Sequence, residues 1–303
     1  MRVSSLEAWI AGKIGAAGRL SIGELREYQL RRLRETIGFA RRHSRFYRER
    51  LAAVGEVVSL ADMAGVPFTT AADIRERGAH FLCVSQSEIS RVVTLQTSGT
   101  SGAPKRLFFT AGDQELTVDF FHHGMTGVTG PGERVLILFP CERPGGIGDL
   151  LLKGLDRFGA AGVPHGPAGC SRETLAAAVR ENVSCVAGLP NQVLALARYA
   201  EAVGGAGGLD IRSVLLSADY VPGAIAAELE RIWGCRVYNH YGMTEMGLGG
   251  GVECDALTGY HLREADLYFE IVDPLTGRPV PDGTAGEVVF TTLTRRGMPL
   301  IRY

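Results

Sequence analysis

The chain has 303 residues, of which 46% are hydrophobic and 21% are charged, a composition that fits a globular protein with a substantial core. Its formal net charge of -1 excludes the large basic surplus that would attract nucleic acid or an anionic membrane surface. We therefore expect neither nucleic acid nor a membrane among its partners.

The N-terminus and the cysteines indicate where the protein works. Glu7 and Lys13 interrupt any apolar N-terminal stretch, so no signal peptide is expected. The longest aliphatic runs, such as 135–139, are too short to span a bilayer. The six cysteines are widely spaced without a CxxC pair, which indicates reduced thiols. These features together predict a cytoplasmic location.

The first two thirds of the chain predict an α/β fold. Residues 20–53 have the spacing of an amphipathic helix, and from about residue 91 strands and helices alternate. Predicted strands are 91–95, 107–110, 134–139, 184–188, 213–217 and 236–238, and predicted helices are 113–125, 147–158, 171–181, 190–203 and 222–233. Such alternation favours a largely parallel sheet covered by helices.

After about residue 252 the helical pattern stops. Residues 267–272 and 287–293 are strand-like and are joined through a turn sequence at 273–277. The chain ends on a further strand-like run at 299–303. This tail predicts a small β subdomain.

A polar loop of sequence TSGTSGAPK occupies residues 97–105, between two predicted strands. Glycines let backbone N–H groups point inward, hydroxyls donate hydrogen bonds and Lys105 adds positive charge, which together suit a polyphosphate. It is not a Walker loop, because Lys105 follows Pro104 instead of opening a helix. An ordinary polar hairpin loop is the alternative.

A second motif, YNHYGMTE, occupies residues 238–245 at the C-terminal end of a predicted strand, where open α/β sheets bind ligands. The ring of Tyr241 can stack on a nucleobase, Thr244 can reach a phosphate, and Glu245 can hold Mg²⁺ through oxygen. The alternative is a core tyrosine and a solvated glutamate.

Taken together, the two motifs resemble those of the adenylate-forming superfamily, which includes the acyl-CoA synthetases. The runs at 286–289 and 299–303 resemble the segment just before that family's ribose-binding aspartate. Within the superfamily, the segments at 30–47, 66–70, 251–254 and 259–261 are most similar to phenylacetate–CoA ligases. The resemblance covers essentially the whole chain, but it does not specify the acid.

The resemblance implies a division of the chain and a set of site residues. Residues 1–251 would form the α/β nucleotide- and acyl-binding region and 252–303 the β subdomain, cut off before the family's small C-terminal domain and its catalytic lysine. By position, Lys105, Thr244 and Glu245 would be catalytic, with Glu245 holding the metal. The implied nucleotide-binding residues are Ser98, Gly99, Thr100, Ser101, Gly102, Lys105, Ser217, Ala218, Asp219, Asn239, His240, Tyr241, Gly242, Met243 and Thr244.

The implied activity is AMP-forming activation of an aromatic or other small carboxylic acid with ATP and Mg²⁺, followed by transfer to CoA. Transfer to a carrier protein and a non-catalytic nucleotide-binding accessory role remain alternatives. The glycine-rich loop at 140–149 is expected to border the acyl pocket, which leaves the acid open. Its partners would be the carboxylate, ATP and CoA, and a homodimer is allowed.

Histidines and cysteines suggest few other sites. Cys254 and His261, with Cys235 and His240 nearby in sequence, could hold Zn²⁺, but their spacing fits no standard zinc pattern. His122 and His123 occupy adjacent helical positions, so we expect them to face different directions and to form no site by themselves.

Overall fold

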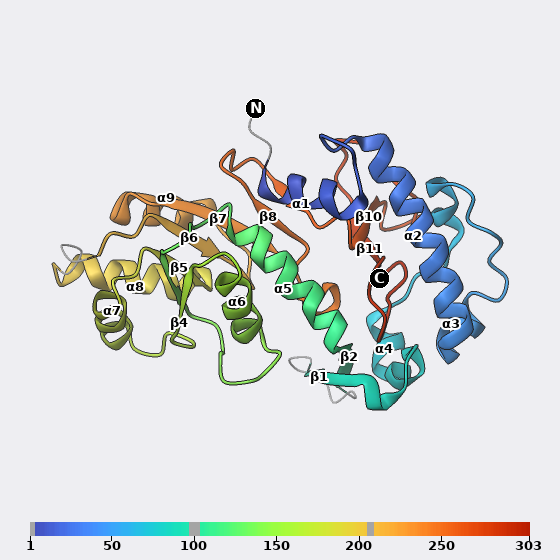
Figure 1. Ribbon diagram of the computed structural model, residues 1–303, viewed down its shortest axis with the longest axis horizontal. Coiled ribbons are helices and arrows are strands. Elements are labelled where there is room, and N and C mark those ends of the chain that lie inside the picture. Colours follow the sequence, from blue (N-terminus) through green and yellow to red (C-terminus); the bar gives the residue numbers. More distant parts are fainter. Residues whose placement is uncertain (1–3, 97–103, 205–208) are drawn as a thin grey trace. The chain divides into compact units, whose positions relative to one another are not determined.

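The computed structural model describes residues 4–96, 104–204 and 209–303 (Figure 1). The predicted loop residues Ser98, Gly99, Thr100, Ser101 and Gly102 lie outside this part of the chain. The described residues form two compact units. Unit 1 contains residues 4–7, Thr117–Met243 and Gly247–Leu262, and unit 2 contains Ala8–Leu116, Thr244–Met246 and Arg263–Tyr303. The functional division at residues 251 and 252 stays a prediction.

Within the described part of unit 1, seven strands form one sheet in the order β4-β3-β5-β6-β7-β8-β9. The strands are β3 (Arg134–Ile137), β4 (Ala161–Pro164), β5 (Cys185–Gly188), β6 (Ser213–Leu216), β7 (Arg236–Tyr241), β8 (Gly251–Glu253) and β9 (Tyr260–Leu262). Neighbours from β4 to β7 are parallel, and β8 and β9 are added antiparallel. The mainly parallel sheet confirms the predicted fold class.

Helices α7 (Ser171–Arg180), α8 (Pro190–Ala202) and α9 (Gly223–Trp233) cover one face of this sheet. Alternate strand residues such as Leu136, Val186 and Val214 form one buried cluster with apolar residues of these helices. Since side chains alternate across a strand, these residues define a single face. Helix α6 (Ile147–Asp156) packs beside β4. This core places the C-terminal end of β7, which carries the second motif.

Unit 2 contains helices and two antiparallel hairpins. The helices are α2 (Ile22–His43), α3 (Arg45–Arg50) and α4 (Ala71–Arg77), with 3₁₀ turns at Leu60–Gly65, Gly78–Phe81 and Gln86–Glu88. Strand β1 (Ile89–Leu95) pairs with β2 (Lys105–Thr110), and β10 (Leu267–Val272) pairs with β11 (Glu287–Thr292). Helices α1 (Ser5–Ile14) and α5 (Ala111–Met125) each continue from one unit into the other.

Two details of unit 2 differ from the sequence prediction. The expected helix over 20–53 is interrupted at Ser44, whose side chain accepts a hydrogen bond from the Tyr47 N–H and so starts a new helix. The expected strand at 299–303 is not regular, because Arg302 has a φ of 47°. Tyr303 nevertheless exchanges two backbone hydrogen bonds of 2.9 Å with Phe290 on β11.

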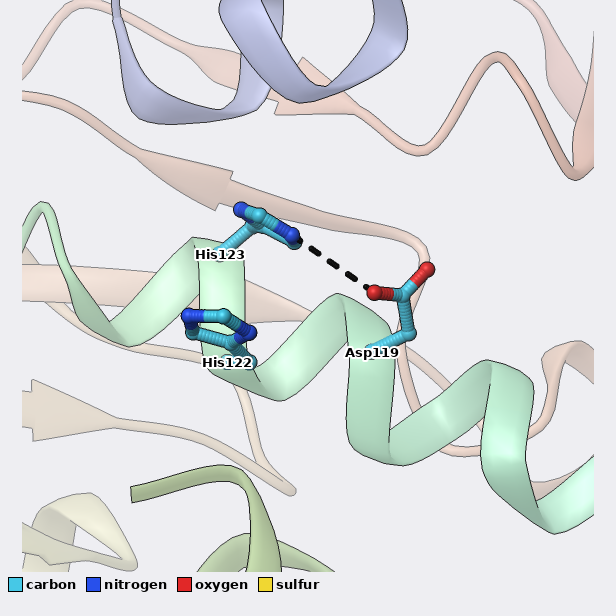
Figure 2. A group of neighbouring side chains, drawn as sticks. All are labelled: Asp119, His122 and His123. Atoms are coloured by element: carbon cyan, nitrogen blue, oxygen red, sulfur yellow. Dashed lines mark ion pairs between the residues drawn. The ribbon is translucent and has the colours of Figure 1, made fainter. Parts of the chain in front are cut away.

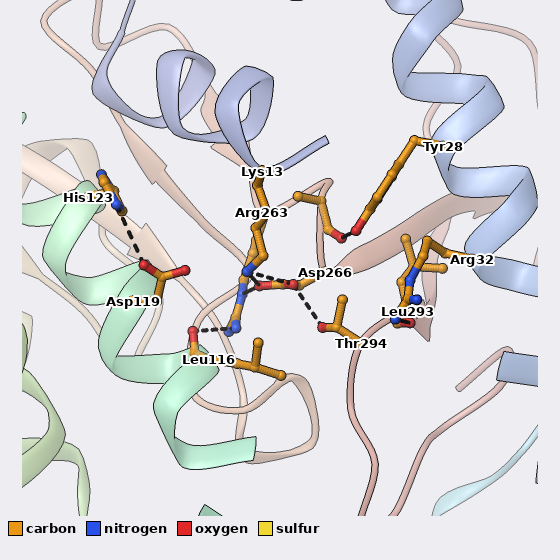
Figure 3. Close-up of polar contacts among 11 residues, drawn as sticks. Lys13, Tyr28, Arg32, Leu116, Asp119, His123, Arg263, Asp266, Leu293 and Thr294 are labelled. Atoms are coloured by element: carbon orange, nitrogen blue, oxygen red, sulfur yellow. Dashed lines mark hydrogen bonds and ion pairs between the residues drawn. The ribbon is translucent and has the colours of Figure 1, made fainter. Parts of the chain in front are cut away.

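Buried charges hold unit 2 together. The carboxylate of Asp266 accepts hydrogen bonds from Lys13, Arg263 and Thr294 at 2.8–3.0 Å (Figure 3). Burial alone would raise the pKa of Asp266, but the charges of Arg263 and Lys13 outweigh it and hold that pKa below its ordinary value. This carboxylate therefore joins α1 to the two segments that flank the β10–β11 hairpin.

A second buried pair fixes the C-terminal segment. The Arg302 guanidinium, which is 2% exposed, donates to the Glu270 carboxylate at 3.1 Å and to the carbonyl of Val66 at 2.7 Å. It also donates to the Gly277 carbonyl at 3.1 Å. These bonds hold residues 302 and 303 against β10 and so position Tyr303.

Candidate nucleotide site

The two sequence motifs meet in unit 2 through a lysine and a glutamate. Lys105 is the first residue of β2, and Glu245 lies in a short 3₁₀ turn, Thr244–Met246. The Lys105 ammonium donates a hydrogen bond to the Glu245 carboxylate and forms an ion pair with it. The two residues are 140 positions apart in the sequence. The fold thus joins the end of the first motif to the end of the second.

Tyr303 completes this group. Its hydroxyl accepts from the Lys105 ammonium at 3.0 Å and donates to Glu245 Oε1 at 3.1 Å. Burial opposes the charge on Lys105, but its bonds to Glu245 and Tyr303 outweigh this and raise the pKa of the lysine. Lys105 therefore stays protonated at neutral pH.

Arg295 holds the backbone at Glu245. Its guanidinium donates to the Glu245 carbonyl at 2.9 Å and to the Phe108 carbonyl at 3.2 Å on β2. Burial lowers the pKa of Arg295 to about 10, with Asp113 and Glu245 opposing the shift, so the side chain remains charged at neutral pH. The sequence predicts neither the contact of Arg295 with Glu245 nor the contacts of Tyr303 with Lys105 and Glu245. It does not show which basic or aromatic residue, distant in the chain, packs against the motif in the fold.

In unit 1, Asn239, His240 and Tyr241 are the last three residues of β7, which pairs with β8. The Tyr241 carbonyl accepts from the Gly250 N–H at 2.9 Å, and its half-buried ring lies 5.9 Å from the ring of Tyr260. Partial burial raises the pKa of Tyr241. The Asn239 N–H donates to the Glu253 carboxylate at 2.8 Å. A half-exposed ring at a strand end is available for stacking.

His240 and Ser217 form a buried pair at the ends of β7 and β6. Ser217 Oγ lies 2.7 Å from His240 Nδ1. The rings of Phe120 and Phe121 on α5 each lie 6.0 Å from the imidazole. Burial lowers the pKa of His240 to about 4, so the ring is neutral at physiological pH. The predicted residues Ser217 and His240 are therefore in direct contact.

The residues after Ser217 form a turn. Ala218 has a φ of 68°, in the left-handed region where residues other than glycine are strained. The exposed carboxylate of Asp219 accepts from the N–H of Tyr220 at 2.7 Å. A strained residue in a predicted ligand loop is a pattern often found at functional sites.

The segment after Tyr241 is tightly packed. A Cβ on Gly242 would lie 2.5 Å from the Leu248 carbonyl oxygen, so only glycine fits. The Met243 carbonyl accepts from the Leu248 N–H at 2.9 Å. Thr244 then opens the 3₁₀ turn that carries Glu245. Gly242 and this turn therefore fix the backbone path from Tyr241 to Glu245.

The family assignment follows from a comparison of the sequence. Residues 48–293 match the sequence model of the family described as AMP-binding enzyme. The chain belongs to this family. It is 29% identical over 294 residues to the phenylacetate-coenzyme A ligase of Pseudomonas putida, covering 93% of this chain and 66% of that protein. It is 30% identical over 307 residues to the Aromatoleum evansii phenylacetate-coenzyme A ligase, covering 96% and 68%.

Solved structures show the same fold. A 2-hydroxyisobutyryl-CoA ligase in complex with 2-HIB-AMP and CoA matches with a TM-score of 0.82 and 26% identity, over 93% of this chain and 63% of that one. The predicted adenylate-forming fold and the phenylacetate–CoA ligase resemblance are thus confirmed. The chain spans about two thirds of the length of the curated relatives that it matches. Among the described residues, no helix has the length and apolarity of a membrane span.

Proposed function

We propose that this chain provides the ATP- and acid-binding site of an AMP-forming carboxylate–CoA ligase. The observation that carries the proposal is the contact of Lys105 with Glu245, which joins the two nucleotide motifs of the family within unit 2. Both side chains are largely shielded from water, where charge interactions with phosphate are stronger than on an open surface.

Each proposed role follows from the chemistry of the side chain. Lys105 donates to the phosphates of ATP, together with Ser98, Gly99, Thr100, Ser101 and Gly102. Thr244 contacts the α-phosphate through its hydroxyl, and the ring of Tyr241 stacks on adenine. We further propose that Ser217, Ala218, Asp219, Asn239, His240, Gly242 and Met243 line the nucleotide and acyl sites.

Glu245 is the proposed Mg²⁺ ligand. Its carboxylate side chain is 6% exposed and lies where the two motifs meet, beside the proposed phosphate ligand Lys105. Carboxylate oxygen is a hard ligand, and Mg²⁺ commonly takes one or two carboxylates together with substrate phosphates and water. When bound, Mg²⁺ would neutralise part of the phosphate charge.

The proposed reaction has two steps. A carboxylate oxygen attacks the α-phosphorus of ATP, the bond to pyrophosphate breaks, and acyl-AMP forms. The CoA thiolate then attacks the acyl carbon, and AMP leaves with the electrons of the broken acyl–oxygen bond. Lys105 and the loop residues hold the phosphates in line for the first step, in which positioning and charge stabilisation supply most of the catalysis.

We propose an aromatic or other small acid as the substrate. Relatives named for phenylacetate and for 2-hydroxyisobutyrate support this class. In the glycine-rich loop at 140–149, a Cβ on Gly148 would lie 2.5 Å from the Cys141 sulfur, so this loop folds closely on itself. The acceptor is proposed to be CoA.

Acid-dependent exchange of labelled pyrophosphate into ATP tests this function. The acids to compare are phenylacetate, benzoate, 2-hydroxyisobutyrate and a long-chain fatty acid. Exchange stimulated by one of the small acids, with an acyl-CoA product when CoA is added, is the expected result. ATP binding without exchange for any acid, in a protein that also carries the family's small C-terminal domain, would contradict the ligase and favour the nucleotide-binding accessory role. Transfer only to a carrier protein would contradict the proposed acceptor.

A further inference from the structure

Three potential metal ligands gather on helix α5, within unit 1. Asp119, His122 and His123 are related by i, i+3 and i+4 spacing, which places neighbouring side chains on one side of a helix. One ligand atom from each residue lies within 4.8 Å of the other two. In the described ranges of the chain, this is the one group of three or more such residues.

Figure 2 shows the three side chains extending from α5, with the ion pair between His123 and Asp119. His123 Nε2 lies 3.5 Å from Asp119 Oδ1, and the His122 and His123 rings are stacked with centroids 4.2 Å apart. The expectation that the two histidines face different directions was therefore wrong. Adjacent Cα–Cβ bonds diverge on a helix, but the side-chain torsions bring the rings together.

We propose that Asp119, His122 and His123 bind a transition-metal dication such as Zn²⁺. Two imidazoles and one carboxylate suit Zn²⁺, Co²⁺ or Ni²⁺, whereas Mg²⁺ and Ca²⁺ prefer oxygen alone. Around one ion with metal–ligand bonds of about 2 Å, the three donor atoms would lie about 3 Å apart. Modest rotation of the side chains from their stacked arrangement achieves this.

The surroundings make this an open surface site of moderate affinity. The side chains of His123 and Asp119 are 30% and 29% exposed, so water can complete the coordination. Arg157 acts electrostatically on His122 and weakens the attraction for a cation. The proposed site is separate in composition and chemistry from the Mg²⁺ site at Glu245, and it does not depend on the proposed ligase function.

Ion binding would stabilise the last turns of α5. Two neighbouring residues of this helix, Phe120 and Phe121, pack against His240 on β7, the strand that carries the second motif. The Ser5 hydroxyl donates to the His123 carbonyl at 2.8 Å, which joins the N-terminal residues to the same turn. An ion that binds the folded chain and joins residues 119, 122 and 123 raises the melting temperature by mass action.

One competing site must be separated in the test. Cys254 and His261 line a cavity of about 420 Å³ in unit 1, and thiolate and imidazole both bind Zn²⁺. Cobalt distinguishes the two, because a thiolate ligand gives Co²⁺ an intense near-ultraviolet charge-transfer band that imidazole and carboxylate do not give.

The experiment is a titration of the 303-residue chain with Co²⁺ followed by absorption, and with Zn²⁺ followed by calorimetry. His123→Gln, His122→Gln and Asp119→Asn are compared with wild type, and His165→Gln is the matched control on another segment of unit 1. Metal-free melting curves show whether each variant is folded. We expect one ion to bind without a thiolate band, each ligand variant to weaken binding at least about tenfold, and His165→Gln to have no effect.

Three results would overturn the proposal. The first is the absence of saturable metal uptake by the wild-type chain. The second is a thiolate band that disappears in Cys254→Ser, which would place the ion at the competing site. The third is unchanged affinity in His123→Gln and Asp119→Asn while both variants remain folded.

Discussion

Lys105 and Glu245 form a largely buried ion pair although they are 140 positions apart in the sequence. Tyr303 contacts both side chains, and Arg295 fixes the backbone of the glutamate. Removing either partner leaves the other charge poorly compensated. The pair therefore links the stability of unit 2 to the groups that we propose for phosphate and Mg²⁺ binding.

Replacing Lys105 by Gln should weaken the binding of ATP. The loss of a charged hydrogen bond to phosphate costs about 1–3 kcal/mol, or roughly fivefold to a hundredfold in affinity. Arg106→Gln is the matched control, because Arg106 is the next residue on β2 and is exposed. Fluorescence titration with labelled ATP measures both. Equal affinities for the two variants would argue against a phosphate role for Lys105.

Replacing Tyr241 separates a stacking role from a packing role. Base–aromatic stacking is worth about 1–3 kcal/mol in nucleic-acid sites, so Tyr241→Ala should lower ATP affinity roughly tenfold to a hundredfold. Tyr241→Phe should be mild, and Tyr220→Ala, which changes an exposed ring, should have no effect. If Tyr241→Ala lowered the free energy of unfolding by about 3–5 kcal/mol while ATP affinity held, the ring would be a core residue.

The sequence predicts regular elements well where the local pattern decides them. Residues 190–203 have helical spacing with Pro190 at the start, and α8 is found at Pro190–Ala202. Strand β4 was missed, because its Gly-Val-Pro sequence indicates a loop and only pairing with β3 makes it a strand. The motif residues of the site were visible in the sequence, whereas Tyr303 and Arg295 reach Glu245 through long-range packing.

His240 should make stability depend on pH. Its pKa is about 4 in the folded chain and 6.5 ordinarily, so below 6.5 the unfolded chain takes up a proton that the folded chain excludes. The contribution of the neutral His240 ring to the free energy of unfolding is therefore fully present above about pH 6.5. It is lost as the pH falls towards 4, a change of about 3 kcal/mol. Urea unfolding across this range should show a shallower pH dependence for His240→Gln than for wild type. Identical slopes would contradict the buried neutral imidazole.

Breaking the Arg302–Glu270 pair should destabilise the chain strongly. Both side chains are 2% exposed, and burial raises the pKa of Glu270 while Arg302 opposes the rise. Arg302→Met leaves an uncompensated buried carboxyl and should lower the free energy of unfolding by about 3–5 kcal/mol. Arg212→Met breaks exposed pairs and should cost less than about 1 kcal/mol. Similar losses for the two variants in urea unfolding would show that burial of the pair is unimportant.

The most direct test of the proposed nucleotide site is the dependence of ATP affinity on Mg²⁺, measured by calorimetry on wild type and Glu245→Gln. If Glu245 holds the ion, wild type should bind ATP more tightly with Mg²⁺ than without it, and the substitution should abolish most of that difference. Glu173→Gln, which changes an exposed carboxylate on α7 outside every proposed site, is the control. A Mg²⁺ effect of the same size in wild type and in folded Glu245→Gln would contradict the assignment of Glu245 as the metal ligand.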